Sequence, residues 1–88
     1  MATMPRERIL VVDDEAAIRE LVSTYLRNEG FVVDEAADGE TALTLCRRQE
    51  PHLVVLDLRL PGIDGTDVLR EIRRDSSVYV IVLTARSE

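Results

Sequence analysis

The sequence predicts an α/β fold built on a doubly wound parallel sheet. Three short apolar runs, at 9–12, 53–56 and 78–83, have the continuous hydrophobic character of parallel strands that helices cover on both faces. Segments with helical spacing of apolar residues alternate with these runs. Alternation of strands and helices favours parallel pairing with right-handed crossovers.

The first strand is predicted at 8–12 and the first helix at 15–28. We expect Asp14 to be the N-cap of this helix and Gly30 to end it in a left-handed conformation. The apolar residues of the helix fall on one face at helical spacing, which predicts that this face is buried. They are Ile18, Leu21, Val22, Tyr25 and Leu26.

A second strand is predicted at 31–35, and a turn at Asp38-Gly39 opens the next helix, which Pro51 stops. The third strand is expected at 52–57, and a loop rich in Pro, Gly and Asp follows it at 60–65. The third helix and the fourth strand are then predicted at 66–74 and 78–83. The inward residues of the two later helices are expected to be Ala42, Leu45, Cys46, Val68, Leu69 and Ile72.

The strand order is predicted to be 2-1-3-4, which is a flavodoxin-like arrangement. The first strand is short and wholly apolar, so we expect it at the centre of the sheet. The chain then steps to the second strand on one side and returns to the third on the other. That reversal creates a crevice at the carboxyl ends of the first and third strands, where ligands bind in open parallel sheets.

Length and composition are those of one small folded domain. The chain has 88 residues, 45% of them hydrophobic, and no long uninterrupted apolar stretch. We expect a core at 8–85 with a tail at 1–7 and a short end at 86–88, in a soluble, cytoplasmic protein without membrane contact. A net charge of −6 argues against direct binding of nucleic acid by this segment. The single cysteine excludes an internal disulfide.

Oxygen-bearing side chains follow three of the predicted strands. Asp13 and Asp14 follow the first, Asp57 ends the third and Thr84 ends the fourth. Taken singly, Asp14 suits a helix cap and Asp57 suits a turn. Taken together, three carboxylates at one rim repel one another, so such a cluster must raise its pKa values, stay hydrated or hold a cation. Mg²⁺ prefers oxygen ligands of this kind.

Asp57 is the predicted phosphoacceptor, because a carboxylate can act as a nucleophile and the loop after it leaves room for a phosphoryl group. Asp13 and Asp14 would then hold the metal. Thr84 could donate its hydroxyl to a phosphoryl oxygen.

The chain resembles the receiver domain of two-component response regulators. The matching motifs are ILVVDDE at 9–15, VVLDLRLPGIDG at 54–65 and IVLTA at 81–85, and the segments AIRELVSTYL and AADGETAL fit as well. The loop motif LPGIDG resembles the branch whose receivers are joined to winged-helix DNA-binding domains of transcription regulators.

The resemblance implies that Asp57 accepts a phosphoryl group from a sensor histidine kinase or a small phosphodonor. It implies that Asp13, Asp14, Asp57 and the backbone carbonyl of Arg59 organise Mg²⁺, and that Thr84 is the switch hydroxyl that reports phosphorylation. A domain of this family is a switch with limited autophosphorylation chemistry, rather than a turnover enzyme.

The chain departs from the family pattern after its fourth strand. The family fold has one more strand and two more helices, which carry a lysine that contacts the phosphoryl group and an aromatic partner of the switch threonine. All eleven basic residues here are arginines. We therefore keep an alternative, a non-signalling interaction or assembly module. We also expect a truncated domain that self-associates, for example as a dimer, through the exposed edge of its fourth strand.

A third possibility, a phosphatase or phosphotransferase that turns over substrate, fits the residues less well. Enzymes of the dehalogenase type place a second acid two positions after the aspartyl nucleophile. That position is Arg59 here, so general acid catalysis has no evident carrier.

Overall fold

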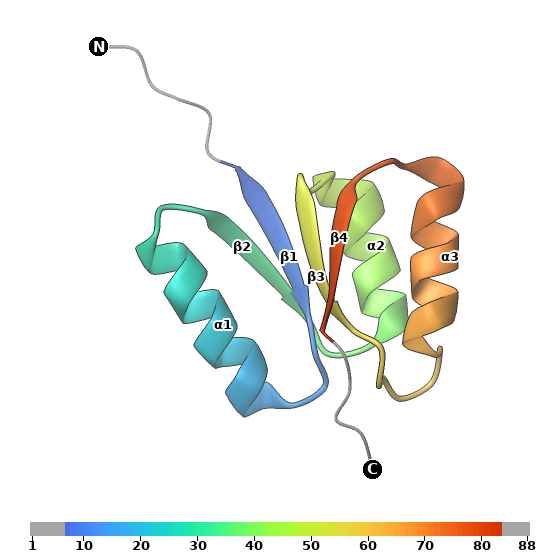
Figure 1. Ribbon diagram of the computed structural model, residues 1–88, viewed down its shortest axis with the longest axis horizontal. Helices are drawn as coiled ribbons and strands as arrows, with labels where there is room; N and C mark the ends of the chain where they lie inside the picture. The colour runs from blue at the N-terminus through green and yellow to red at the C-terminus, as the bar shows by residue number, and fades with distance from the viewer. Residues whose placement is uncertain (1–6, 84–88) are drawn as a thin grey trace.

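The computed structural model describes residues 7–83, which form four strands and three helices in strict alternation (Figure 1). The strands are β1 (Arg8–Val12), β2 (Val32–Ala36), β3 (Leu53–Asp57) and β4 (Tyr79–Leu83). The helices are α1 (Ala16–Asn28), α2 (Gly39–Gln49) and α3 (Gly65–Asp75). The predicted elements are confirmed, and each predicted boundary lies within one residue of the observed one. None of the described helices is long and apolar enough to cross a membrane.

The strands form one parallel sheet in the order β2-β1-β3-β4, as predicted. β1 lies between β2 and β3, and Val12 is in register with Ala36 on one side and Leu56 on the other. All four strands therefore point the same way, and the residues that follow β1 and β3 emerge at the same edge.

The helices lie on opposite faces of the sheet (Figure 1). Alternate side chains of the strands therefore pack against different helices. On one face, α2 and α3 cover a core that includes Leu10, Val12, Val54 and Leu56, all almost completely buried. On the other face, α1 covers a smaller core. Its buried members are Ile9, Val11, Val33 and Val55.

Local capping accounts for where α2 begins and ends. The side chain of Asp38 accepts a hydrogen bond from the Thr41 amide at 2.8 Å, which satisfies one of the free donors of the first turn. The backbone hydrogen bond to Thr41 is the main reason why the pKa of Asp38 lies below its ordinary value. The helix stops at Gln49 through a left-handed Glu50, directly before Pro51.

The prediction that Asp14 caps α1 is wrong. The helix starts at Ala16, its N-cap is Glu15, and no side chain caps it. Asp13 takes part of that role, because its Oδ1 accepts a hydrogen bond from the Glu15 amide at 2.9 Å. The prediction for the other end is confirmed, since Gly30 has a φ of 100° just beyond the helix.

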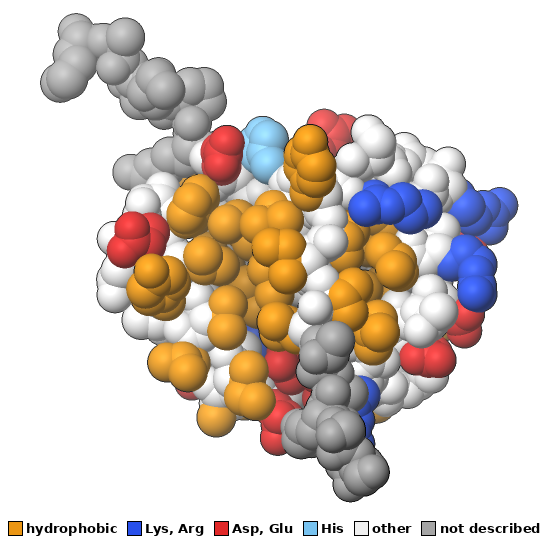
Figure 2. Space-filling model, in the orientation of Figure 1, with side chains coloured by type: hydrophobic (Ala, Val, Ile, Leu, Met, Phe, Trp, Pro, Cys, Tyr) orange, Lys and Arg blue, Asp and Glu red, His pale blue; other side chains and the backbone are white. Residues whose placement is uncertain are grey.

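The prediction that the apolar stripe of α1 is buried along its whole width is also wrong. Val22 and Leu26 pack against the core, but Leu21 is 71% exposed. The helix lies against β1 and β2, so its outer apolar side reaches no strand. We call the exposed apolar residues of α1 and β4 the apolar face; they are Ile18, Leu21, Tyr25, Tyr79 and Ile81. Figure 2 shows a broad gathering of apolar side chains on the side of the molecule viewed in Figure 1.

His52 fixes the start of the β1–β3 pairing, a role that the sequence did not indicate. Its Nδ1 accepts a hydrogen bond from the Arg8 amide at 3.0 Å, and its own amide donates to the Arg8 carbonyl at 2.8 Å. These bonds lie just before the first residue pair of the two strands, Ile9 with Leu53. They hold the register from the end opposite the carboxylates.

Gly65, the first residue of α3, lies too close to the chain after β3 for any side chain. Its amide donates to the Leu58 carbonyl at 3.1 Å, and a Cβ atom at this position would lie 2.4 Å from the Leu58 Cα. We predict that Gly65→Ala lowers the free energy of unfolding by about 1–3 kcal/mol, because the backbone must shift to admit the methyl group. Urea denaturation would measure the loss. The neighbouring exposed substitution Thr66→Ala should change stability by less than about 0.5 kcal/mol, and equal losses would contradict the steric explanation.

Candidate functional site

Three carboxylates meet at the edge of the sheet where β1 and β3 end. Asp13 and Asp14 directly follow β1, and Asp57 is the last residue of β3. One carboxylate oxygen from each residue lies within 4.8 Å of the other two. The structure therefore brings together the three acidic residues that the sequence singled out.

Asp13 is the most deeply placed of the three, with only 3% of its surface exposed. Its amide donates to the Ala36 carbonyl at 3.1 Å, its Oδ1 accepts from the Glu15 amide at 2.9 Å, and its carbonyl accepts from Arg19 at 2.9 Å. Burial raises the pKa of Asp13 above its ordinary value, the Glu15 hydrogen bond opposes this, and the negative charge of Asp57 adds to it.

Asp14 and Asp57 are more accessible than Asp13. Asp14 is exposed and Asp57 is half-buried. The Oδ1 atom of Asp57 accepts a hydrogen bond from the Arg59 amide at 3.0 Å, which turns the chain sharply at the end of the strand. An accessible carboxylate beside a buried one leaves an open approach for a ligand from solvent.

Two predicted site groups cannot be placed with the carboxylates. Thr84 lies outside the described residues. Arg59 is exposed and donates its amide to Asp57, and its carbonyl is the predicted metal ligand. The assignment of Thr84 and of the Arg59 carbonyl therefore stays a prediction.

The donor set of the three carboxylates fits Mg²⁺. The oxygens are hard ligands, and like charges this close together are stabilised by a divalent cation between them. A site with one buried and two more accessible carboxylates also leaves positions for water or a phosphoryl oxygen, as Mg²⁺ sites that bind phosphate require. Bound Mg²⁺ would neutralise negative charge on a phosphoryl group there.

The contacts of Arg19 beside Asp13 were not predicted from the sequence. Arg19 of α1 binds the Asp13 carbonyl and also Glu35 of β2. Nothing in the spacing of these residues signals the contact, because they come from separate elements and are 16 positions apart.

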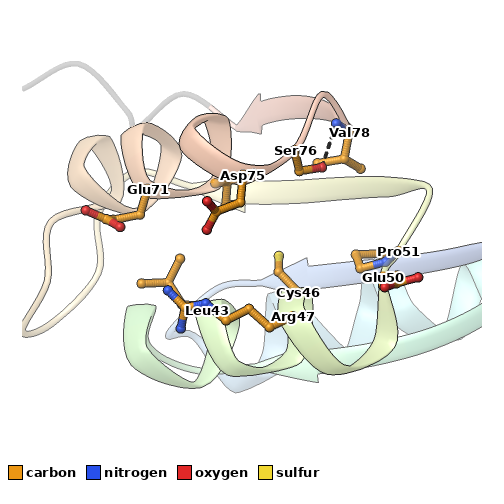
Figure 3. A pocket seen from close by; sticks show the side chains of 10 residues that line it. Leu43, Cys46, Arg47, Glu50, Pro51, Glu71, Asp75, Ser76 and Val78 are labelled. Carbon is orange, nitrogen blue, oxygen red and sulfur yellow. Dashed lines mark hydrogen bonds between the residues drawn. The ribbon is translucent and has the colours of Figure 1, made fainter.

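A hollow elsewhere in the molecule contains none of the three carboxylates (Figure 3). It has a volume of about 370 Å³ and lies between α2 and α3, lined by Cys46, Pro51, Glu71 and Val78 among others. Pro51 precedes β3 and Val78 precedes β4, so this hollow is at the opposite end of the strands. The hollow and the acidic site are therefore separate features of the molecule.

Comparison with known proteins supports the reading of the site. The family model of the response regulator receiver domain matches residues 9–88. The chain is 50% identical over 88 residues to the DNA-binding response regulator MtrA of Mycobacterium tuberculosis, covering all of this chain and 38% of that protein. It is 51% identical over 85 residues to the probable transcriptional regulator ycf27 of Porphyridium aerugineum, covering 97% of this chain and 35% of that protein. The chain thus spans little more than a third of these relatives.

Solved structures agree with this result. The response regulator TrrA of Thermotoga maritima, solved in complex with Mg²⁺-BeF, is 46% identical with a TM-score of 0.85, and the match covers 92% of this chain and 71% of that one. The BeF3-activated receiver domain of Klebsiella pneumoniae RstA is 29% identical with a TM-score of 0.87, over 93% and 70% of the two chains. Fold, acidic triad and sequence agree, and the chain belongs to the response regulator receiver domain family.

Proposed function

We propose that this receiver domain is a phosphorylation-dependent switch in which Asp57 accepts a phosphoryl group from a sensor histidine kinase in the cytoplasm. Asp13, Asp14, Asp57 and the Arg59 carbonyl would hold Mg²⁺. The observation that supports this most strongly is the meeting of three carboxylates within 4.8 Å at the carboxyl ends of β1 and β3. A receiver domain is a signalling module, and its output is a change of state rather than a released product.

The proposed reaction is one phosphoryl transfer. An oxygen of the Asp57 carboxylate attacks phosphorus, and the bond between phosphorus and the donor's histidine nitrogen breaks with its electron pair left on that nitrogen. Asp13 and Asp14 hold their charges beside the transferred group, so they contribute through the metal that they bind. The Thr84 hydroxyl would then donate to a phosphoryl oxygen and report the new charge.

The named relatives support the wider role. MtrA is named a DNA-binding response regulator and ycf27 a probable transcriptional regulator, and both are much longer than this chain. We propose that this receiver likewise controls a DNA-binding output. Because the chain has a net charge of −6, the contact with DNA would belong to another region of a longer protein.

An assembly module is the second candidate function, and one feature of the described residues favours it. The apolar face combines exposed side chains of α1 with Tyr79 and Ile81 on β4, the edge strand of the described sheet. An apolar edge strand favours pairing with a second copy of the chain.

Phosphorylation distinguishes the two candidates. With acetyl phosphate and Mg²⁺, the wild type should form an acid-stable, hydroxylamine-sensitive adduct, detectable by the mass of the intact protein. Asp57→Asn should form none, because the amide is not a nucleophile. Asp64→Asn is the matched control, since Asp64 is an exposed acid that caps α3 outside the triad, and asparagine also caps helices. Absence of an adduct in the wild type would favour the assembly module.

The raised pKa of Asp13 predicts a specific dependence of stability on pH. The folded protein binds this proton more tightly than the unfolded chain, so the contribution of Asp13 to stability falls as pH rises from its ordinary pKa through the raised value. Asp13→Asn keeps an oxygen acceptor for the Glu15 amide but removes the charge. Without divalent cations at pH 7, this variant should be more stable than the wild type, and the difference should vanish below an ordinary aspartate pKa of about 3.9.

Mg²⁺ should reverse this order of stability. At 100 times its dissociation constant, Mg²⁺ bound only to the folded wild type adds about 2.7 kcal/mol, and Asp13→Asn should gain much less. Thermal unfolding with and without Mg²⁺ would measure both effects. Equal gains in the two proteins would argue against Asp13 as a ligand.

Self-association is predicted to depend on β4. Light scattering after size exclusion should show oligomers of the wild type that grow with concentration. Ile81→Lys should return the chain toward monomer, because it places a charge on the strand's exposed side. Leu21→Lys, on the helical part of the apolar face, tests whether α1 contributes. A wild type that stays monomeric at high concentration would refute the prediction.

A further inference from the structure

Arg19 is unusually enclosed for a charged residue near the start of a surface helix. Its side chain is 18% exposed, and it makes two directed contacts. Its Nη1 donates to the Asp13 carbonyl at 2.9 Å, and its Nε donates to Glu35 Oε1 at 3.2 Å. Arg19 therefore links the turn that carries two site carboxylates to the neighbouring strand β2.

The hydrogen bond from Arg19 to the Asp13 carbonyl adds to two others that hold Asp13 in position. β2 holds the Asp13 amide through the Ala36 carbonyl, and the Glu15 amide holds one carboxylate oxygen. Arg19 holds the remaining backbone group, the carbonyl. This carbonyl belongs to the peptide unit that joins Asp13 to Asp14, so its orientation sets the direction in which the chain carries the Asp14 carboxylate.

Arg27 provides an internal comparison, because it binds the same carboxylate without touching Asp13. Its Nη1 donates to Glu35 Oε2 at 3.0 Å and its Nη2 donates to the Val33 carbonyl at 3.0 Å. Its side chain is 48% exposed. Both arginines tie α1 to β2, but only the contacts of Arg19 reach the acidic site.

We infer that Arg19 is a positioning residue of the acidic site, which orients the Asp13–Asp14 peptide from its anchor on Glu35 and thereby sets the affinity of the three carboxylates for Mg²⁺. This inference rests on the proposed function, since it gives a new role toward the metal of that site. The fork of the guanidinium is essential, because an ammonium group carries the charge but cannot hold two acceptors in one fixed plane. Removal of a group that orients metal ligands without binding the metal itself weakens metal binding by about 10–100-fold.

The test compares Arg19→Gln, Arg19→Lys and Arg27→Gln with the wild type. Calorimetric titration with MgCl₂ gives the dissociation constant, and urea denaturation gives the stability of each metal-free protein. Arg19→Gln should weaken Mg²⁺ binding by about tenfold. Arg27→Gln should change it by less than about twofold while losing comparable stability, because it breaks the other half of the same link to Glu35. Arg19→Lys should resemble Arg19→Gln more than the wild type.

A metal-free readout accompanies the titration. The amide resonances of Asp14 and Glu15 should shift in Arg19→Gln and stay near the wild-type positions in Arg27→Gln, because Arg19 binds the Asp13–Asp14 peptide whereas the hydrogen bonds of Arg27 described above are with Glu35 and Val33. Loss of Mg²⁺ affinity in proportion to stability in both glutamine variants would overturn the positioning role. Wild-type affinity in Arg19→Gln would also overturn it and leave the proposed function standing. A wild type that binds no Mg²⁺ would overturn the proposed function itself, and this inference with it.

Discussion

The parallel register of β1 with β3 is the constraint on which the acidic site depends. Val12 pairs with Leu56, so Asp13, which follows Val12, and Asp57, which follows Leu56, lie at the same end of the sheet. A shift of one residue would turn the side chains of a strand to the opposite faces and separate its buried residues from their helices. The buried cores on both faces therefore hold the register, and the register holds the carboxylates together.

This arrangement concentrates negative charge that the fold must stabilise. Asp13 is buried next to two other carboxylates, and its raised pKa reflects both burial and their repulsion. Hydrogen bonds from the surrounding structure to the Asp13 backbone and to one of its carboxylate oxygens hold this residue in place. These contacts come from the protein itself and fix the position of Asp13 and of the peptide that leads to Asp14.

The two faces of the sheet are covered unequally. Within residues 7–83, α2 and α3 pack over the larger core, whereas α1 is the one helix on the other face and lies over β1 and β2. Tyr79 is 79% exposed as a consequence, although its strand is as apolar as the buried ones. This uncovered apolar surface and the acidic edge are separate features, and they correspond to the two candidate functions, assembly and phosphorylation.

The prediction from sequence was accurate where short-range pattern and topology rules apply. Apolar runs and helical spacing predicted the elements, and the central place of β1 predicted the strand order and the meeting of Asp13, Asp14 and Asp57. Two predictions failed where the answer depended on neighbours. Asp14 looked like a cap but Asp13 binds the Glu15 amide, and the apolar stripe of α1 was taken as buried although no strand lies beneath Leu21.

The sequence by itself determined the α/β class, the order of the strands and the identity of the acidic residues, because periodicity and strand-end position are local properties of the chain. Only the tertiary structure decided which apolar residues are covered, how deeply each carboxylate lies, and which distant side chains hold them. The link from Glu35 through Arg19 to Asp13 joins three elements. Such contacts depend on distances in space, which no spacing along the chain encodes.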